Sequence, residues 1–436
     1  MDRYPTEISI QSPKIGGSGG VNLDLDTYRI NRAVFLLTLI LCACLFTVLF
    51  YNMSTATIVD DGSPYYSDFV FHIESAITAG SYSLIGLIIK YLFMLPYDTA
   101  ALLLSVIIAA LELLTVFAVY LLLLEMDRIA GKQTSERDRA VYMWLSLASI
   151  FIISIVIPGV LPSFQFLAFN MTCWQNDTYL AMRPFSILAL VFFLRIYNTL
   201  EERFDWKDLV CFSVMLFLST WMKPSFFMGF AILLLLLALW HLMKNKDKYE
   251  VFKRYLILLL CTVPSLVCIL VQNTMLFGDE GNSIILAPFL LVSLRVTNWQ
   301  LALAVFLLFP LLVLFLERRA LGKKTIGFII IWLLWVVQNF IAFFLAEGGS
   351  RTYDFNFGWG MVFSDGLLYV ASYYMWYNRY TSDDRDMLPC YMDDPVKSKR
   401  VARNYYIFGG VLLAYLVFLG VFYFILLSQG YSFTKL

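Results

Sequence analysis

Long apolar runs recur along the whole chain and are separated by short polar segments. Each run has roughly 20 residues, which as a helix crosses a hydrocarbon core of about 30 Å. The runs do not alternate polar and apolar positions, so they predict helices rather than the strands of a membrane barrel. We expect an all-α, polytopic transmembrane bundle of about eleven spans, near residues 32–52, 98–124, 140–158, 184–199, 208–222, 225–243, 255–277, 299–316, 325–345, 359–377 and 404–428.

Polar or interrupted segments flank and divide this transmembrane domain, which we place at residues 32–428. Residues 1–31 are polar and include the sequence GGSGG, which predicts a disordered cytosolic tail, and residues 429–436 are expected to form a short outer tail. The segment 76–96 is apolar, but Gly80, Gly86 and Lys90 interrupt it. We expect it to form a helix in the first outer loop, which lies in the membrane interface or packs in the bundle.

Lysine and arginine are distributed unevenly between alternate loops. The basic loops are 125–139, 200–207, 244–254, 317–324 and 378–403. The loops that alternate with these basic loops carry about one positive charge each. Loops rich in lysine and arginine stay in the cytosol. The chain is thus predicted to be a multi-pass integral membrane protein, in the plasma membrane if its source is bacterial. Its N-terminus is expected in the cytosol and, after an odd number of spans, its C-terminus outside.

The composition agrees with a membrane protein. Of 436 residues, 60% are hydrophobic and 15% are charged, whereas a soluble domain has roughly 25% charged residues. The formal net charge of zero gives no reason to expect a nucleic-acid partner. The seven cysteines show neither metal-ligand spacing nor a disulfide framework. We therefore expect the bilayer as a partner and no cofactor, and a divalent metal is not supported.

The first outer loop concentrates acidic side chains around one of the two histidines. Asp60 and Asp61 are followed by Asp68 and His72, and a helix would place the last two on one face. A carboxylate beside a histidine can act as a general base with an orienting partner. Alternatively, the loop is simply solvated and Asp68 begins a helix as its N-cap.

Four outer cations lie against apolar runs, where charges are costly and usually have a partner or a function. They are Arg183, Lys223, Arg295 and Arg351. Arg183 precedes Pro184 at a helix start, and backbone amides there would help it to bind an anion. The alternatives are an arginine that reaches the headgroups and, for Lys223, the tip of a helical hairpin.

The fifth outer segment mixes aromatic and polar side chains in a way that suits a sugar or a lipid-linked ligand. Its candidate residues are Glu347, Tyr353, Asp354, Asn356 and Trp359. The alternative is an aromatic belt at the membrane interface. No span shows the series of carboxylates expected for proton or sodium coupling, so the polar groups gather on one face.

The segments DDGSPYYSDFVFH, MRPFS, WMKPSF and GGSRTYDFNFGWG, together with the general layout, resemble the GT-C superfamily of polytopic glycosyltransferases, in particular uncharacterised bacterial members. The resemblance implies an inverting transfer of a sugar from a polyprenyl-phosphate donor to a glycan or lipid acceptor at the outer face. It also implies that the cations named above bind the lipid phosphate. One of Asp60, Asp61 and Asp68 would be the base, with His72 orienting it.

Other functions remain open from the sequence. A polysaccharide polymerase would join lipid-linked repeat units, but a long outer loop between late spans usually marks it, and here those loops are short. A transporter or lipid flippase would carry polar groups along a path through the bundle. A non-catalytic membrane scaffold is the third alternative.

Overall fold

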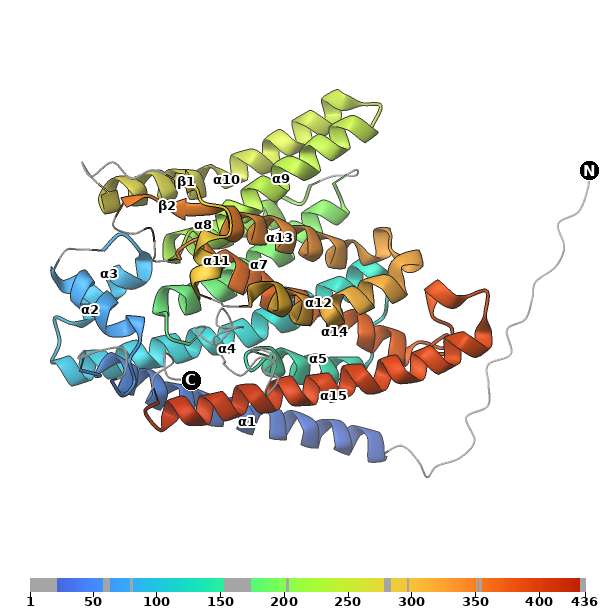
Figure 1. Ribbon diagram of the computed structural model, residues 1–436, viewed down its shortest axis with the longest axis horizontal. Coiled ribbons are helices and arrows are strands. Elements are labelled where there is room, and N and C mark those ends of the chain that lie inside the picture. Colours follow the sequence, from blue (N-terminus) through green and yellow to red (C-terminus); the bar gives the residue numbers. More distant parts are fainter. Residues whose placement is uncertain are drawn as a thin grey trace, which may run out of the picture.

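The computed structural model describes residues 22–57, 63–78, 81–152, 174–200, 204–277, 284–295, 298–349, 352 and 355–431, and nearly all of its regular structure is helical (Figure 1). The helices are α1 (Asn22–Ser54), α2 (Asp68–Thr78), α3 (Leu84–Leu92), α4 (Tyr97–Ala130), α5 (Glu136–Ser149), α7 (Asp177–Asn198), α8 (Trp206–Met222), α9 (Ser225–Lys244), α10 (Lys248–Phe277), α11 (Leu290–Arg295), α12 (Trp299–Glu317), α13 (Ile326–Phe344), α14 (Gly358–Thr381) and α15 (Pro395–Ser428). Short 3-10 helices are Arg318–Ala320, Lys323–Thr325 and Pro389–Tyr391. Two strands, β1 (Ile284–Leu286) and β2 (Leu345–Glu347), form an antiparallel ribbon in which Ile285 faces Ala346.

Eight of the described helices are long and apolar enough to cross a membrane, which supports an integral membrane protein. They are α1, α4, α7, α9, α10, α12, α13 and α15. The predicted count of about eleven is not confirmed. Helices stand at the other three expected spans, but α8 has only 17 residues and the described part of α5 only 14. Seventeen of the 24 residues of α14 are buried inside the bundle, so this helix need not be as apolar as one that faces lipid.

The chain reverses at two opposite ends of the bundle (Figure 1). We call one the α2 end, because α2, α3 and the β-ribbon lie there, and the other the basic end, where α4, α9, α12 and α14 finish. At the α2 end the Tyr65 hydroxyl donates to the Ser428 carbonyl at 3.1 Å, which joins the first outer loop to the last helix. At the basic end Lys132 Nζ donates to Asn378 Oδ1 at 2.6 Å. The turns of the chain thus alternate between the α2 end and the basic end, which agrees with the predicted alternation of outer and cytosolic loops.

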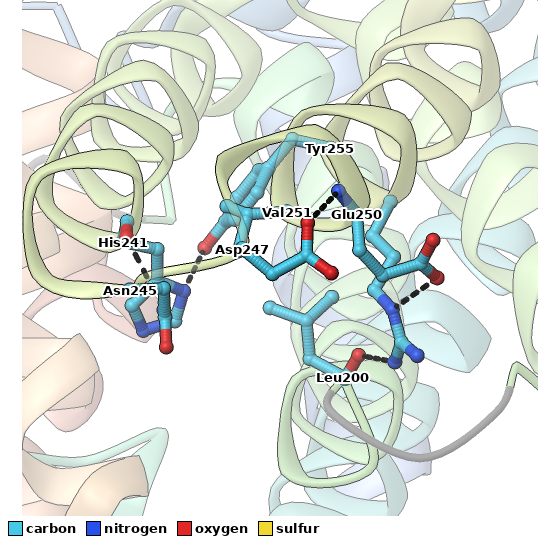
Figure 2. Close-up of a pocket in the computed structure, with 8 residues that line it drawn as sticks. Leu200, His241, Asn245, Asp247, Glu250, Val251 and Tyr255 are labelled. Carbon is cyan, nitrogen blue, oxygen red and sulfur yellow. Dashed lines mark hydrogen bonds and ion pairs between the residues drawn. The ribbon is translucent and has the colours of Figure 1, made fainter.

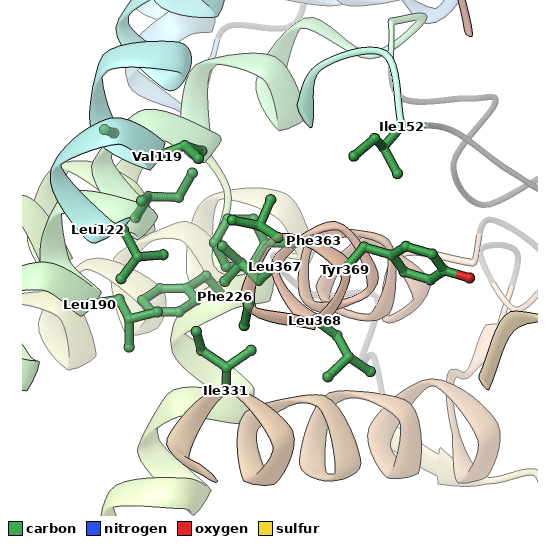
Figure 3. Close-up of a cluster of buried hydrophobic side chains, with 14 of the residues drawn as sticks. Val119, Leu122, Ile152, Leu190, Phe226, Ile331, Phe363, Leu367, Leu368 and Tyr369 are labelled. Atoms are coloured by element: carbon green, nitrogen blue, oxygen red, sulfur yellow. The ribbon is translucent and has the colours of Figure 1, made fainter. Parts of the chain in front are cut away.

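Helices α7, α13 and α14 form the centre of the bundle. In the apolar window of α7, 72% of residues are buried, against 28% in α1. Figure 3 shows the core where Leu122 of α4, Leu190 of α7, Phe226 of α9, Ile331 of α13 and Leu367 of α14 converge. Buried apolar side chains from five helices therefore hold the elements that carry the polar groups of the α2 end.

Three expectations about local structure need correction. Helix α1 begins at Asn22, so the last ten residues of the expected tail are helical, while residues 1–21 lie outside the described residues. The helix expected at 76–96 is shorter than predicted, since α3 spans only Leu84–Leu92, and a separate helix, α2, precedes it. Asp68 begins α2, and Ser83 caps α3 by accepting a bond from the Gly86 amide at 3.1 Å. The β-ribbon was not predicted, because its strands have three residues each and lie 58 residues apart.

Candidate functional site

A histidine held by a buried carboxylate lies at the centre of the polar cluster at the α2 end. His72 of α2 is hydrogen bonded through Nδ1 to Oδ1 of Asp177, the first residue of α7. The Asp177 side chain is fully buried, whereas 29% of the His72 side chain is exposed. An acid that orients a partly exposed imidazole is the arrangement expected of a general base.

The N-terminus of α7 positions both acids of this cluster. Asn176 caps α7, since its Oδ1 accepts from the Tyr179 amide at 2.8 Å. The same side chain donates from Nδ2 to Asp68 Oδ2 at 2.7 Å, and the Asp68 amide donates to the Gln175 carbonyl at 3.0 Å. The cap therefore binds α2 to α7 and brings His72 to Asp177.

Lys223 enters the cluster from the turn between α8 and α9. Its Nζ donates to Thr178 Oγ1 at 3.1 Å and lies 5.0 Å from the centre of the Trp359 ring. Trp359 in turn lies 4.9 Å from the Tyr179 ring, centre to centre. A cation over an aromatic face is stabilised there without losing its charge, so Lys223 can present a positive charge beside His72.

Arg183 lies deeper in the bundle and is engaged by a second buried acid. Its guanidinium donates to Glu112 Oε1 of α4 at 2.8 Å, and only 12% of the arginine side chain is exposed. The sequence predicted that Arg183 binds an anion, and in the structure its guanidinium binds the Glu112 carboxylate of the protein itself. The pair joins α4 to α7 beneath the His72 cluster.

The remaining predicted residues fall into two groups. Glu347 and Asn356 are joined to each other, since Asn356 Nδ2 donates to Glu347 Oε2 at 2.8 Å near the β-ribbon. Arg295 is the last residue of α11, and its side chain is outside the described part of the chain. The residues that also lie outside it are Asp60, Asp61, Arg351, Tyr353 and Asp354.

Electrostatics around His72 favour its protonated form. Burial lowers the pKa of the imidazole, but the negative charge and hydrogen bond of Asp177, with a smaller contribution from Asp68, outweigh burial and raise the pKa above its ordinary value. The positive charge of Lys223 opposes this rise only weakly. Asp177 is therefore the main cause of the rise of the His72 pKa.

Sequence reasoning missed Asp177 and Glu112. We expected His72 to work with an aspartate of its own loop, but its hydrogen-bonded carboxylate is 105 residues away. The residues Asn176, Asp177 and Thr178 before an apolar run are a helix-start signal that marks Asp177. Glu112 is a lone acid in an apolar span, which is itself a reason for attention. Asp365 is likewise buried in α14, where its Oδ1 accepts from Trp335 Nε1 at 2.7 Å.

A separate pocket of about 150 Å³ lies at the basic end, between α9 and α10 (Figure 2). The ring of His241 lines it and is bonded to Tyr255 through Nδ1 at 2.9 Å and to Tyr197 through Nε2 at 3.3 Å. Both ring nitrogens are bonded to tyrosine hydroxyls, which indicates a structural role for this histidine.

The described residues contain no group of three or more His, Cys, Asp or Glu side chains arranged to hold a metal ion. No family model matches the chain, and no curated protein or solved structure matches it either.

Proposed function

We propose that the chain is a membrane glycosyltransferase that moves a sugar from a polyprenyl-phosphate donor to a glycan or lipid acceptor at the α2 end. The observation that carries this proposal is the His72–Asp177 pair with Lys223 bound to the adjacent Thr178. A base beside a cation is what a transfer from a phosphate leaving group requires, because a proton is removed while negative charge develops. The likeness of the outer segments to GT-C enzymes supports the same reaction.

In the proposed reaction the neutral imidazole of His72 is the base, and its raised pKa makes it a stronger proton acceptor. Its Nδ1 is held by Asp177, and Nε2 has no hydrogen bond to any described residue, which leaves it for an acceptor hydroxyl. The hydroxyl oxygen attacks the anomeric carbon while its proton passes to Nε2. This assignment replaces the role first expected for Asp60, Asp61 or Asp68 and makes Asp177 the orienting acid.

Lys223 is proposed to stabilise the leaving group. As the bond between the anomeric carbon and the phosphate oxygen breaks, the electron pair stays on polyprenyl phosphate, and Lys223 offsets the added negative charge. Arg183 is already bound to Glu112 and so acts as a positioning residue, which holds the start of α7 in place. A single displacement of this kind inverts the anomeric carbon.

The proposal is tested with the purified full-length protein, a polyprenyl-phosphate sugar and plain polyprenyl phosphate. We expect both lipids to bind to the wild type and to His72→Gln, because the lysine contacts the shared phosphate. We expect Lys223→Met to weaken both by roughly tenfold, the value of one lost charged contact. Lys90→Met is the matched control, since Lys90 is exposed on α3 at the same end.

Sugar transfer to an acceptor lipid separates the base from the binding site. His72→Gln should lose transfer while it keeps donor binding, and Asp177→Asn should retain a small part of the transfer rate. Equal binding by Lys223→Met and the wild type, or full transfer by His72→Gln, would rule out the assigned roles. Folded protein that binds neither lipid would rule out the glycosyltransferase.

A transporter or flippase is the second candidate, and one observation favours it. We expected no series of intramembrane carboxylates, yet Glu112 and Asp365 are buried inside α4 and α14. Buried acids within spans are typical of coupled transport. Movement of a lipid-linked sugar across reconstituted vesicles that is lost in Glu112→Gln, with no transfer product, would favour this function over the enzyme.

A further inference from the structure

A polar pocket of about 340 Å³ lies at the basic end, at the opposite end of the bundle from the His72 cluster. It is formed by the first turn of α5, the end of α14 and the segment that follows α14. Two arginines line it, together with Tyr380, the hydroxyl side chains of Thr381 and Ser382, and the carboxylate of Asp383; the arginines are Arg137 and Arg385. The pocket lies where the predicted topology places the cytosolic surface of the membrane.

Both walls of the pocket are fixed by hydrogen bonds. On the α5 side, Asp138 closes a capping box with Ser135, and its Oδ1 accepts from the Tyr377 hydroxyl of α14 at 3.0 Å. On the other side, the Arg385 carbonyl accepts from the Tyr406 hydroxyl of α15 at 2.5 Å. The Arg385 amide donates to the Ser382 carbonyl at 3.1 Å. The two arginines therefore extend from backbone that is already held in place.

Arg137 and Arg385 differ from several arginines near them. Arg379 is paired with Glu317 at 2.7 Å, and Arg195 with Glu125 at 3.0 Å. Within the described residues, neither Arg137 nor Arg385 forms an ion pair, and both are exposed. Two guanidinium groups that share a cavity repel each other unless an anion lies between them.

We propose that this pocket binds a phosphate group, either that of a lipid headgroup or free phosphate. Guanidinium groups form bidentate, charge-assisted bonds with phosphate oxygens. The cytosolic leaflet supplies anionic headgroups on the side where the predicted topology places this pocket. Asp383 opposes a purely anionic ligand, so its carboxylate limits the affinity for a phosphate that carries no ammonium group.

The test uses the full-length protein in a maltoside detergent, which contributes no phosphate. Dihexanoyl phosphatidic acid and inorganic phosphate are titrated separately at constant ionic strength, and the thermal unfolding midpoint is recorded. Arg137→Gln with Arg385→Gln removes both guanidiniums of the pocket. The matched control is Arg139→Gln with Arg400→Gln, which removes two exposed positive charges from the same end without touching the pocket.

We expect a saturable rise of the wild-type midpoint, kept by the control pair and weakened about tenfold or more in the pocket pair, because two charged contacts are lost. A rise with both ligands shows that phosphate suffices, and a rise with phosphatidic acid alone assigns the lipid. Asp383→Asn should bind either ligand more tightly, the reverse of the effect of a structural defect. No saturable rise, or equal weakening in both pairs, would overturn the proposal.

Discussion

His72 depends on a residue far away in the chain for its charge state. Asp177 is fully buried at the start of α7, and its Oδ2 has no hydrogen-bond partner among the described residues. A buried carboxylate with one free oxygen interacts strongly with the one charge beside it. The imidazolium form of His72 supplies that charge, which is why the pKa of His72 is raised.

The titration of His72 can be observed directly, because the chain has only two histidines. In a His241→Gln background, the remaining imidazole signal in NMR should titrate above the ordinary histidine pKa of about 6.5. Asp177→Asn should move the titration to lower pH, since it removes the largest cause that raises the pKa. If His72 titrates at or below the ordinary histidine pKa while Asp177 is still present, the proposed pairing of His72 with Asp177 is contradicted.

The His72–Asp177 pair also makes the stability of the fold depend on pH in a predictable direction. A histidine whose pKa is raised by folding stabilises the fold fully below its unfolded pKa of about 6.5. That stabilisation is lost as the pH rises through the folded pKa. Asp177→Asn should therefore flatten the fall of the thermal midpoint across this window, and an unchanged slope would show that the pair does not form in solution.

At the scale of elements, two ion pairs, each with a buried glutamate, fix α4 against α7. Glu112 binds Arg183 at 2.8 Å, and Glu125 binds Arg195 at 3.0 Å near the basic end. The two helices run in the same direction, so the two pairs together exclude a shift of one helix along the other. The start of α7, with Asp177, is therefore held at a fixed height relative to α4.

Removing one partner of the deeper pair should be costly. Arg183→Met leaves Glu112 buried without its cation, and we expect the free energy of unfolding to fall by about 3–5 kcal/mol. Combining it with Glu112→Gln should recover part of the loss. The control is Arg128→Met, because Arg128 is half exposed and Glu125 keeps Arg195; it should cost under about 1 kcal/mol. Equal losses in the two single variants would contradict a buried pair.

Helix α15 packs closely enough to require a glycine. A Cβ added to Gly420 would lie 1.9 Å from the carbonyl oxygen of Phe151, a backbone atom that cannot rotate away. Gly420→Ala should therefore destabilise the protein by about 1–3 kcal/mol. Gly410→Ala in the same helix is the control, since its nearest neighbour would be 4.0 Å away and alanine is the better helix former. Thermal unfolding of the two variants compares them directly.

At the scale of the whole molecule, the two ends carry different chemistry. The His72 cluster occupies the α2 end, and the phosphate pocket occupies the basic end. Ser428 of α15 lies at the α2 end, whereas the turn between α9 and α10 lies at the basic end (Figure 1). The excess of lysine and arginine predicts that the basic end faces the cytosol.

This orientation can be measured with single cysteines in a cysteine-free background. A membrane-impermeant thiol reagent added to intact cells should label Gln429→Cys and should label Lys246→Cys only after the membrane is opened. Both positions are exposed, so labelling depends only on the side of the membrane on which each residue lies. The reverse labelling pattern would invert the predicted topology and place the His72 cluster in the cytosol.

The spanning helices and their alternation could be predicted from sequence, because the bilayer imposes local demands. A span must be long and apolar within its own residues, and basic loops mark one side. His72, Lys223 and Trp359 were likewise identified as polar or aromatic outer residues beside apolar runs. A helix also stands at the expected span 359–377, although α14 is not among the eight helices apolar enough to cross a membrane, because a helix surrounded by protein does not have to be apolar.

Only the tertiary structure decided which of these residues act together. His72 meets Asp177 across 105 residues, and Arg183 meets Glu112 across 71. Such partners carry no shared local pattern, because an ion pair depends on helix packing and register rather than on spacing along the chain. The sequence thus determined where polar groups meet the membrane, and the packing of α2, α4 and α7 determined which carboxylate each cation binds.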